Sequence, residues 1–378
     1  MKKVLLAFDT FKDSISAIKL CEASERILKE LSPELEVTQL PLSDGGEGFL
    51  FSMEKAFSSL GVPFAKHSLE VRGPLGTLHT AYYGVANQQV GVIELAQTSG
   101  LELVPVSMRN PYKTTAHGAG QMISYLYWLG IKELVIGLGG SSTSEGGLSV
   151  LFGTGAADFK FQGEVPEILR GEDLPRVTEV QLASSMFEEL KVTLACDVTN
   201  ELLGERGAAK VFGKQKGMQD WLSYERTVMQ HAAELLETMS GMPNIGSLKS
   251  GGAAGGIAAG IIAAFKKVEV VSGVEYICQA ISLDSKVSEF DFLITGEGKY
   301  DEQTQGGKVV SKMRNLNPHA FIICGKNETQ ESYRVYDFVS RFGSEYSMEF
   351  PEDCLEKVLR ELSVELVVRN DFSSKSED

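Results

Sequence analysis

The sequence has few of the residues that usually mark a disulfide framework or a zinc site. Its five cysteines are widely spaced without a CxxC pair, and its five histidines are scattered along 378 residues. An odd number of isolated cysteines is typical of reduced thiols in the cytosol. Scattered histidines give little support to a metal site built on imidazole groups. The composition therefore predicts a cytoplasmic protein with reduced cysteines.

Long hydrophobic runs and a surplus of positive charge are also lacking. No segment approaches the ~20 apolar residues that cross a bilayer, and the first apolar run stops at Asp9, too early for a secretory signal. Asp and Glu number 51 against 36 Lys and Arg, a formal net charge of −15. A surface that binds nucleic acid needs the opposite balance. We expect a small-molecule substrate, and neither nucleic acid nor a membrane as a partner.

The common nucleotide-binding signatures are absent. The sequence contains no GxxxxGK[ST] loop, no HRD or DFG kinase motif and no GxSxG nucleophile elbow. The nearest approach to GxGxxG is residues 137–142, which lack the third glycine and lie in the middle of the chain. This position and the missing glycine disfavour a dinucleotide-dependent dehydrogenase.

What the sequence does contain is a recurring short apolar run that stops at a carboxylate among small residues. Each run predicts a buried strand, and parallel strands bring the groups after their carboxyl ends to one edge of the sheet. Glycines there let backbone N–H groups approach an anion, while the acids can hold Mg²⁺ or accept a proton. The carboxylates are Asp9, Asp44, Glu145, Asp197, Glu297 and Asp301. This pattern indicates phosphate chemistry.

The order of the expected elements predicts an α/β fold with two domains. Strands and helices alternate at both ends of the chain, as in crossover units. Residues 69–95 instead alternate apolar with polar side chains around tight turns, which is typical of an antiparallel meander. We expect a Rossmann-like three-layer parallel-sheet domain from residues 1–64 and 288–378. A larger mixed α/β domain at 65–287 is expected as an insertion, with the active site in the cleft between the two.

Individual elements follow from periodicity and capping signals. A serine at position 14 or 16 predicts the start of a helix that continues to about residue 31. Further helices are expected at about 49–60, 116–129, 220–239, 253–265 and 351–368. Residues 160–190 are weakly patterned and predict no regular element.

Several loop motifs occur in a characteristic order. They are DTFK (9–12), DGGEG (44–48), GPLG (73–76), SGL (99–101), RNP (109–111), IGLGGSST (136–143), CDV (196–198), RGAA (206–209), VFG (211–213), QKG (215–217), AAGG (253–256) and ITGEG (294–298) with Asp301, Gln303, Thr304, Gly307 and Lys308. Each motif is weak alone, but the ordered set is specific. It resembles the class I bacterial glycerate kinases over nearly the whole chain.

The resemblance implies ATP- and Mg²⁺-dependent phosphorylation of D-glycerate on two α/β domains, and it allows a homodimer. Some positions depart from the family pattern. Asp13 stands where the family usually has Gly, Ser144 and Glu145 replace Asn-Asp, and Lys214 replaces Pro. Because these changes lie in glycine-rich loops, two alternatives stay open: a kinase for another small hydroxy acid, or a non-catalytic ligand-binding relative.

Phosphoryl transfer requires charge neutralisation at the phosphates and a carboxylate that accepts the hydroxyl proton. The candidate residues are assigned to these roles. Asp197, Asp44 and Asp301 are candidate catalytic residues, and Asp197 and Glu297 are candidate Mg²⁺ ligands. The anion-binding loop is predicted at Gly139, Gly140, Ser141, Ser142 and Thr143, with a helix N-terminus behind it. Further substrate or phosphate contacts are expected from Lys12, Arg109, Arg206, Lys216, Thr304 and Lys308. For each acid the structural alternative is a turn or helix cap, and for each cation a solvated surface charge.

Overall fold

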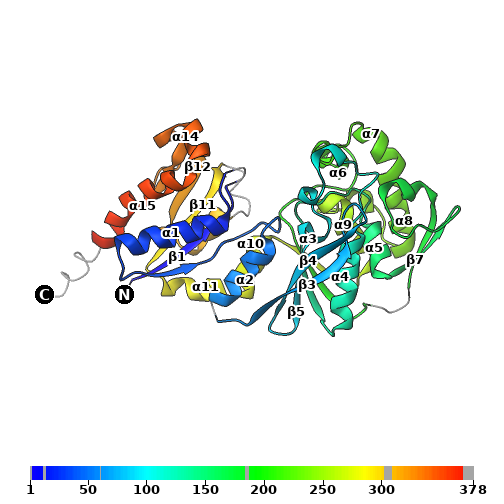
Figure 1. Ribbon diagram of the computed structural model, residues 1–378, viewed down its shortest axis with the longest axis horizontal. Coiled ribbons are helices and arrows are strands. Elements are labelled where there is room, and N and C mark those ends of the chain that lie inside the picture. The colour runs from blue at the N-terminus through cyan, green and yellow to red at the C-terminus, as the bar shows by residue number, and fades with distance from the viewer. Residues whose placement is uncertain (1, 12–13, 60, 184–186, 302–308, 369–378) are drawn as a thin grey trace. The chain divides into compact units, whose positions relative to one another are not determined.

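The computed structural model describes residues 2–11, 14–59, 61–183, 187–301 and 309–368. The chain forms two compact units. The terminal unit comprises Met1–Asp44, Phe51–Val62 and Gly273–Asp378, and the inserted unit comprises Gly45–Leu50 and Pro63–Ser272. Elements from the two chain ends, blue and red in Figure 1, lie together in the terminal unit. Among the described residues, no helix is both long enough and apolar enough to span a bilayer.

The terminal unit is built on a five-stranded parallel sheet with the order β13-β12-β11-β1-β2. On one face, Phe321 and Ile323 pack with side chains of the helices α1 and α15, whereas Ile322 packs with Val310 of α12 on the other. Helices therefore cover both faces, which confirms the predicted three-layer architecture. The bounds are β1 (Lys3–Phe8), β2 (Glu36–Gln39), β11 (Phe292–Tyr300), β12 (Phe321–Asn327), β13 (Val335–Asp337), α1 (Ala17–Leu31), α12 (Val309–Leu316) and α15 (Pro351–Val368).

The first helix of the terminal unit begins at a predicted capping residue. Ser16 caps α1 by accepting a hydrogen bond from the N–H of Lys19 at 3.3 Å. The second part of the terminal unit begins at Gly273, earlier in the chain than the expected boundary at 287. Lys312 of α12 forms ion pairs of 3.2 Å with both Glu275 and Asp284. The short helices that carry these two acids therefore belong to the terminal unit. The remaining helices are α10 (Gly273–Ala280), α11 (Leu283–Lys286), α13 (Phe338–Phe342) and α14 (Ser344–Glu349), together with α2 (Phe49–Ser59), of which Phe49 and Leu50 belong to the inserted unit.

The inserted unit contains a six-stranded mixed sheet with the order β10-β9-β6-β5-β4-β3. Strands β3, β4 and β5 pair antiparallel in sequence, which confirms the predicted meander. The other neighbours, β5 with β6, β6 with β9 and β9 with β10, are parallel. The bounds are β3 (Phe64–Arg72), β4 (Leu78–Ala86), β5 (Val90–Glu94), β6 (Glu133–Gly137), β9 (Lys191–Ala195) and β10 (Lys267–Val271).

Two features of the inserted unit were not predicted. The segment 160–190 contributes a two-stranded antiparallel sheet of β7 (Ala157–Phe161) and β8 (Val177–Leu182). Strand β10 pairs with β9 at the edge of the main sheet, although its sequence KVEVV is not an apolar run. Its side chains are exposed or partly buried, as is usual at the edge of a sheet. The strand therefore has no hydrophobic pattern from which it could be predicted.

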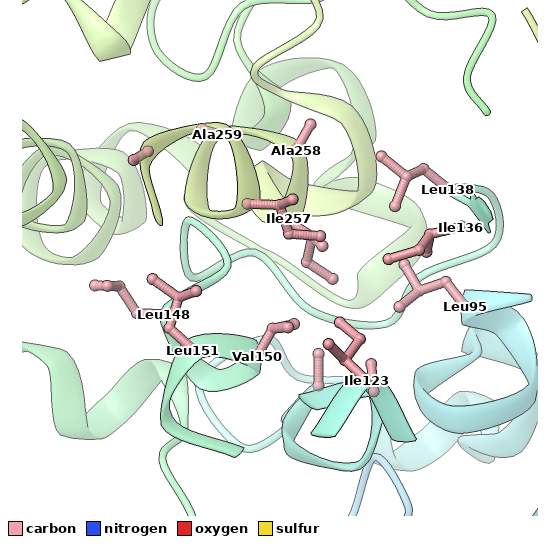
Figure 2. Packing of buried hydrophobic residues seen from close by; sticks show 14 of the residues in the cluster. Leu95, Ile123, Ile136, Leu138, Leu148, Val150, Leu151, Ile257, Ala258 and Ala259 are labelled. Carbon is pink, nitrogen blue, oxygen red and sulfur yellow. The ribbon is translucent and has the colours of Figure 1, made fainter. Parts of the chain in front are cut away.

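The core of the inserted unit packs closely behind the strand ends. Figure 2 shows Ile257, Ala258 and Ala259 of α9 on one side of this core and Leu148, Val150 and Leu151 of α5 on the other, with Leu138 beside them. The two helices can approach closely because Gly147 has no side chain; a Cβ there would lie 2.8 Å from the Cα of Ile257. The helices are α3 (Leu95–Ser99), α4 (His117–Trp128), α5 (Leu148–Thr154), α6 (Ala208–Phe212), α7 (Trp221–Tyr224), α8 (Gln230–Ser240) and α9 (Ile257–Ala264). This packing supports the loop from Leu138 to Gly147.

Candidate active site

The carboxyl ends of three parallel strands lie side by side in the inserted unit. Glu94 at the end of β5 is in register with Gly137 of β6, which is in register with Ala195 of β9. The loops that follow these strands therefore share one edge of the sheet. A cavity of about 390 Å³ lies here, and its lining includes Glu47, Glu94, Gln97, Leu101, Glu102, Gly139, Gly140, Ser141, Val198, Phe212, Gln215, Lys216 and Gly255.

The predicted anion-binding loop is divided between the cavity and the core. Gly139, Gly140 and Ser141 line the cavity. Ser142 is buried, and both its hydroxyl and its backbone N–H donate to the carbonyl oxygen of Ser99 at 2.9 Å. Thr143 is also fully buried. The next helix starts only at Leu148 and has seven residues, so the expected helix N-terminus does not directly follow the loop.

Lys216 brings a buried positive charge to this loop. Its side chain is 3% exposed, and its ammonium donates to the hydroxyl of Ser141 at 2.8 Å and to the carbonyl oxygen of Thr143 at 2.5 Å. Burial lowers the pKa of Lys216 to about 8, although the carboxylate of Glu145 opposes this shift. Because an ammonium has three N–H donors, these two bonds leave one donor for a ligand in the cavity.

Glu145 lies behind the loop, outside the lining of the cavity. Its side chain is fully buried, and one carboxylate oxygen accepts a hydrogen bond of 2.5 Å from the hydroxyl of Ser149. Ser149 in turn accepts from the N–H of Ala116 at 2.9 Å, which ties the loop to the start of α4. Burial raises the pKa of Glu145, while the bond from Ser149 and the charge of Lys216 lower it. Glu145 therefore contacts the interior and influences the cavity through Lys216.

The glycine-rich segment Gly45–Gly48 lies against the same strand ends. A Cβ on Gly45 would be 2.2 Å from the carbonyl oxygen of Ala195, and a Cβ on Gly139 would be 2.1 Å from the Cα of Gly46. Only glycine permits both backbone approaches. They bring Glu47 into the lining of the cavity, opposite in charge to Lys216.

Asp197 follows β9 at this edge and is partly buried. The adjacent Val198 lines the cavity. Asn200 is used structurally, because its side-chain amide donates to the carbonyl oxygen of Arg206 at 3.0 Å. Arg206 itself is exposed and is not part of the cavity lining.

Arg109 is placed differently from the sequence expectation. Its guanidinium pairs with Glu102 at 3.1 Å and donates to the carbonyl oxygen of Val104 at 3.4 Å. It lines a second cavity of about 640 Å³, together with Lys113, Gln219 and others, and not the cavity that contains Lys216. Its contact with Glu102 makes it a neighbour of the first cavity's wall.

The remaining predicted acids belong to the terminal unit. Asp9 follows β1, Asp44 follows the extended segment after β2, and Glu297 and Asp301 lie at the end of β11. These strands are adjacent and parallel, so the acids share the carboxyl edge of that sheet. Asp301 lies 3.3 Å from the ammonium of Lys299. The predicted Lys12, Thr304 and Lys308 lie outside the described residues, and an active site shared between the two units stays a prediction.

Comparison with known proteins identifies the family. A sequence model described as the glycerate kinase family matches residues 4–362. The chain belongs to the glycerate kinase family. It is 35% identical to the glycerate kinase of Halalkalibacterium halodurans over 312 residues, covering 82% of this chain and 80% of the relative. It is 33% identical to the glycerate 2-kinase of Escherichia coli K12, covering 83% and 81%.

A solved structure agrees with this assignment. The crystal structure assigned as glycerate kinase 2 from Salmonella typhimurium LT2 has a TM-score of 0.79 and 28% sequence identity, and the match covers 98% of this chain and all 100% of that one. The similarity therefore extends over both units of this glycerate kinase, and the chain is a kinase enzyme.

Sequence reasoning missed part of the glycerate kinase cavity. Glu94 ends an apolar run like the other acids, but no glycine flanks it, and the rule that selected the others required glycine or small polar neighbours. Glu102 belongs to none of the recognised motifs, and Gln215 was matched only as part of the QKG motif, without a predicted role. The apolar lining residues Leu101, Val198 and Phe212 lie within recognised motifs, but the sequence assigned them no contact with the cavity.

Proposed function

We propose that this glycerate kinase family member transfers the terminal phosphoryl group of ATP to a hydroxyl group of D-glycerate. The observation that carries the proposal is the buried ammonium of Lys216, bonded to Ser141, in the lining of a cavity that Glu47 and Glu94 also line. Family membership supplies the substrate class. A hydroxy acid matches this lining, since its carboxylate needs a cation and its hydroxyl groups need acceptors.

Lys216 and Ser141 are the proposed contacts for an anionic group, either the carboxylate of glycerate or a phosphate. A charge-assisted hydrogen bond from a desolvated ammonium is stronger than one in water. The backbone of Gly139 and Gly140 allows an anion to approach closely, because no side chain intervenes. Arg206, Arg109, Lys12, Thr304 and Lys308 remain proposed secondary contacts.

Asp197 is the proposed general base, and Asp44 and Asp301 are the alternatives. A base must lie next to the hydroxyl that reacts, and Asp197 comes from the same sheet edge as the cavity. Loss of the hydroxyl proton to this carboxylate would make the oxygen a better nucleophile towards phosphorus.

Mg²⁺ is proposed as the metal that neutralises the phosphates of ATP. The described residues contain no group of three or more His, Cys, Asp or Glu side chains that could hold an ion alone. This fits Mg²⁺, which is usually bound by one or two carboxylates together with substrate phosphates. Asp197 and Glu297 are the carboxylates proposed for this contact.

The enzyme is proposed to act in the cytoplasm. All five cysteines are free and buried, as expected in a reducing compartment.

A coupled assay of ADP release with D-glycerate, ATP and Mg²⁺ tests the proposal, with ³¹P NMR to identify which hydroxyl is phosphorylated. Turnover is expected with D-glycerate, and Asp197→Asn is expected to reduce kcat by about 100-fold or more. A panel of other small hydroxy acids serves as the comparison. Folded protein that turns over another acid but not D-glycerate would contradict the proposal.

A further inference from the structure

Glu94 is a buried carboxylate to which the predicted chemistry gives no role. It ends β5 and is 2% exposed. Its two oxygens accept hydrogen bonds from the backbone N–H of Leu50 at 2.9 Å and of Gly48 at 3.2 Å. These N–H groups belong to the start of α2, where no backbone acceptor exists within the helix. Glu94 thus satisfies donors that would otherwise be buried without partners.

The bonds of Glu94 fix a segment that has little stiffness of its own. Three of the five residues from Asp44 to Gly48 are glycines, which lose the most conformational freedom when ordered. Gly45 lies close to the backbone of Ala195, and Gly46 lies close to the backbone of Gly139. The carboxylate of Glu94 adds two directional, charge-assisted hydrogen bonds to these close approaches.

The segment matters because it carries Glu47. This residue is exposed and lines the same cavity as Lys216. Its carboxylate can accept hydrogen bonds from the hydroxyl groups of a bound hydroxy acid, provided that the loop has the right position. A displacement of about 1 Å at a reacting group can reduce the rate by about 100-fold.

We propose that Glu94 is a positioning residue for the phosphoryl transfer: by binding the N–H groups of Gly48 and Leu50, it holds the Gly45–Gly48 loop and Glu47 in the geometry that the reaction requires. The proposal rests on the proposed function. It assigns Glu94 no contact with the reacting atoms, although its carboxylate lies in the wall of the cavity.

The test is Glu94→Gln in the full chain, which keeps the shape and removes the charge. Amide hydrogen exchange in residues 48–50 is expected to be at least about tenfold faster. A glutamine side chain has only one acceptor oxygen, and its NH₂ group cannot accept the second N–H. We expect kcat to fall about 10- to 100-fold with KM within about threefold of wild type. Glu94→Asp keeps the charge with a shorter arm and is expected to recover part of kcat.

Three results would overturn the proposal. Unchanged exchange at residues 48–50 would show that Glu94 does not hold the loop. Faster exchange with unchanged kcat and KM would show a purely structural role, and a raised KM with unchanged kcat would show a direct contact with the ligand. If Glu94→Gln does not fold, the same three readouts apply to Glu94→Asp.

A matched control and a double variant locate the effect. Glu102→Gln makes the same charge change in the same cavity, but Glu102 pairs with Arg109 and should leave exchange at 48–50 unchanged. Glu47→Gln with Glu94→Gln should be less than additive in kcat, and strict additivity would contradict action through the loop. Absence of glycerate turnover in the wild type would defeat the proposed function alone, because the exchange experiment needs no substrate.

Discussion

Two loops meet at the cavity of the inserted unit, and buried charges of opposite sign hold them. The Gly45–Gly48 loop and the adjoining Leu50 offer N–H donors, which the carboxylate of Glu94 accepts. In the Leu138–Gly147 loop, Ser141 Oγ and Thr143 O accept hydrogen bonds from the ammonium of Lys216. Both loops satisfy a buried charge with their own polar groups, as burial demands. The cavity lining therefore contains carboxylates and an ammonium.

Of the two buried charges, Lys216 is expected to have the larger effect on activity when it is removed. Lys216→Met keeps most of the volume but removes the charge and both bonds to the Leu138–Gly147 loop. We expect kcat/KM to fall about 100- to 1,000-fold, the range found when one donor to a developing charge is removed. Steady-state kinetics measure it. Lys214→Met is the matched control, because Lys214 is exposed two residues earlier. Equal losses in both variants would remove Lys216 from the site.

The contact between the two loops can be broken at Gly139. A methyl group there would lie 2.1 Å from the Cα of Gly46, so Gly139→Ala must push the loops apart. We expect at least about 1–3 kcal/mol of lost stability and a lower kcat. At Gly140 the nearest atom to a new Cβ is 3.5 Å away, and the only strain comes from φ of +66°. Gly140→Ala should therefore cost about 1–2 kcal/mol. Thermal unfolding that ranks Gly140→Ala as the worse variant would contradict the loop contact.

The buried charge of Lys216 also predicts a sensitivity of activity to pH. Burial lowers the pKa of Lys216 to about 8, so its positive charge is present below this pH and is lost as pH rises through it. Activity should fall on the alkaline side near pH 8. The carboxylate of Glu145 raises the pKa of Lys216, so Glu145→Gln should move this alkaline limb to lower pH. A pH profile of kcat/KM measures the shift. A limb that moves to higher pH would show that the two groups do not interact as described.

The smallest effects separate neighbouring serines of the Leu138–Gly147 loop. Ser142 donates to the carbonyl oxygen of Ser99 away from the cavity, so Ser142→Ala should cost about 1 kcal/mol of stability and leave KM unchanged. Ser141 lines the cavity and accepts from Lys216, so Ser141→Ala should raise KM by about tenfold. Denaturant unfolding and steady-state kinetics on both variants give the comparison. A KM effect at Ser142 equal to that at Ser141 would contradict the division of the loop.

Much of the fold could be predicted from the sequence, because the hydrophobic periodicity and the capping residues indicate the same helices. The helix at Pro351–Val368 was predicted to the residue, and Ser16 was one of two predicted caps for α1. The parallel-sheet rule also predicts that the loops after β6 and β9, which carry Gly139 and Asp197, share one edge of the sheet, in agreement with the register of these strands. Strand β10 was not predicted, because an exposed edge strand need not be apolar.

The site was readable only in part. The sequence could identify the Leu138–Gly147 loop but could not distinguish Ser141, which faces the cavity, from Ser142, which bonds to Ser99. Glu94 and the burial of Lys216 depend on partners far along the chain, at Leu50 and Ser141, and no local pattern encodes such distances. Tertiary contacts of this kind decide which polar side chains bind ligand and which hold loops.

The sequestered sulfur atoms make the enzyme convenient for site-specific labelling. Burial raises the pKa of the Cys21 and Cys278 thiols to about 12, so the nucleophilic thiolate is scarce at neutral pH. The other three cysteines are buried as well. A single cysteine introduced at an exposed position such as Lys214 should therefore react with a maleimide dye far faster than the native ones. Fluorescent reporters of ligand binding could then be attached without first replacing any natural residue.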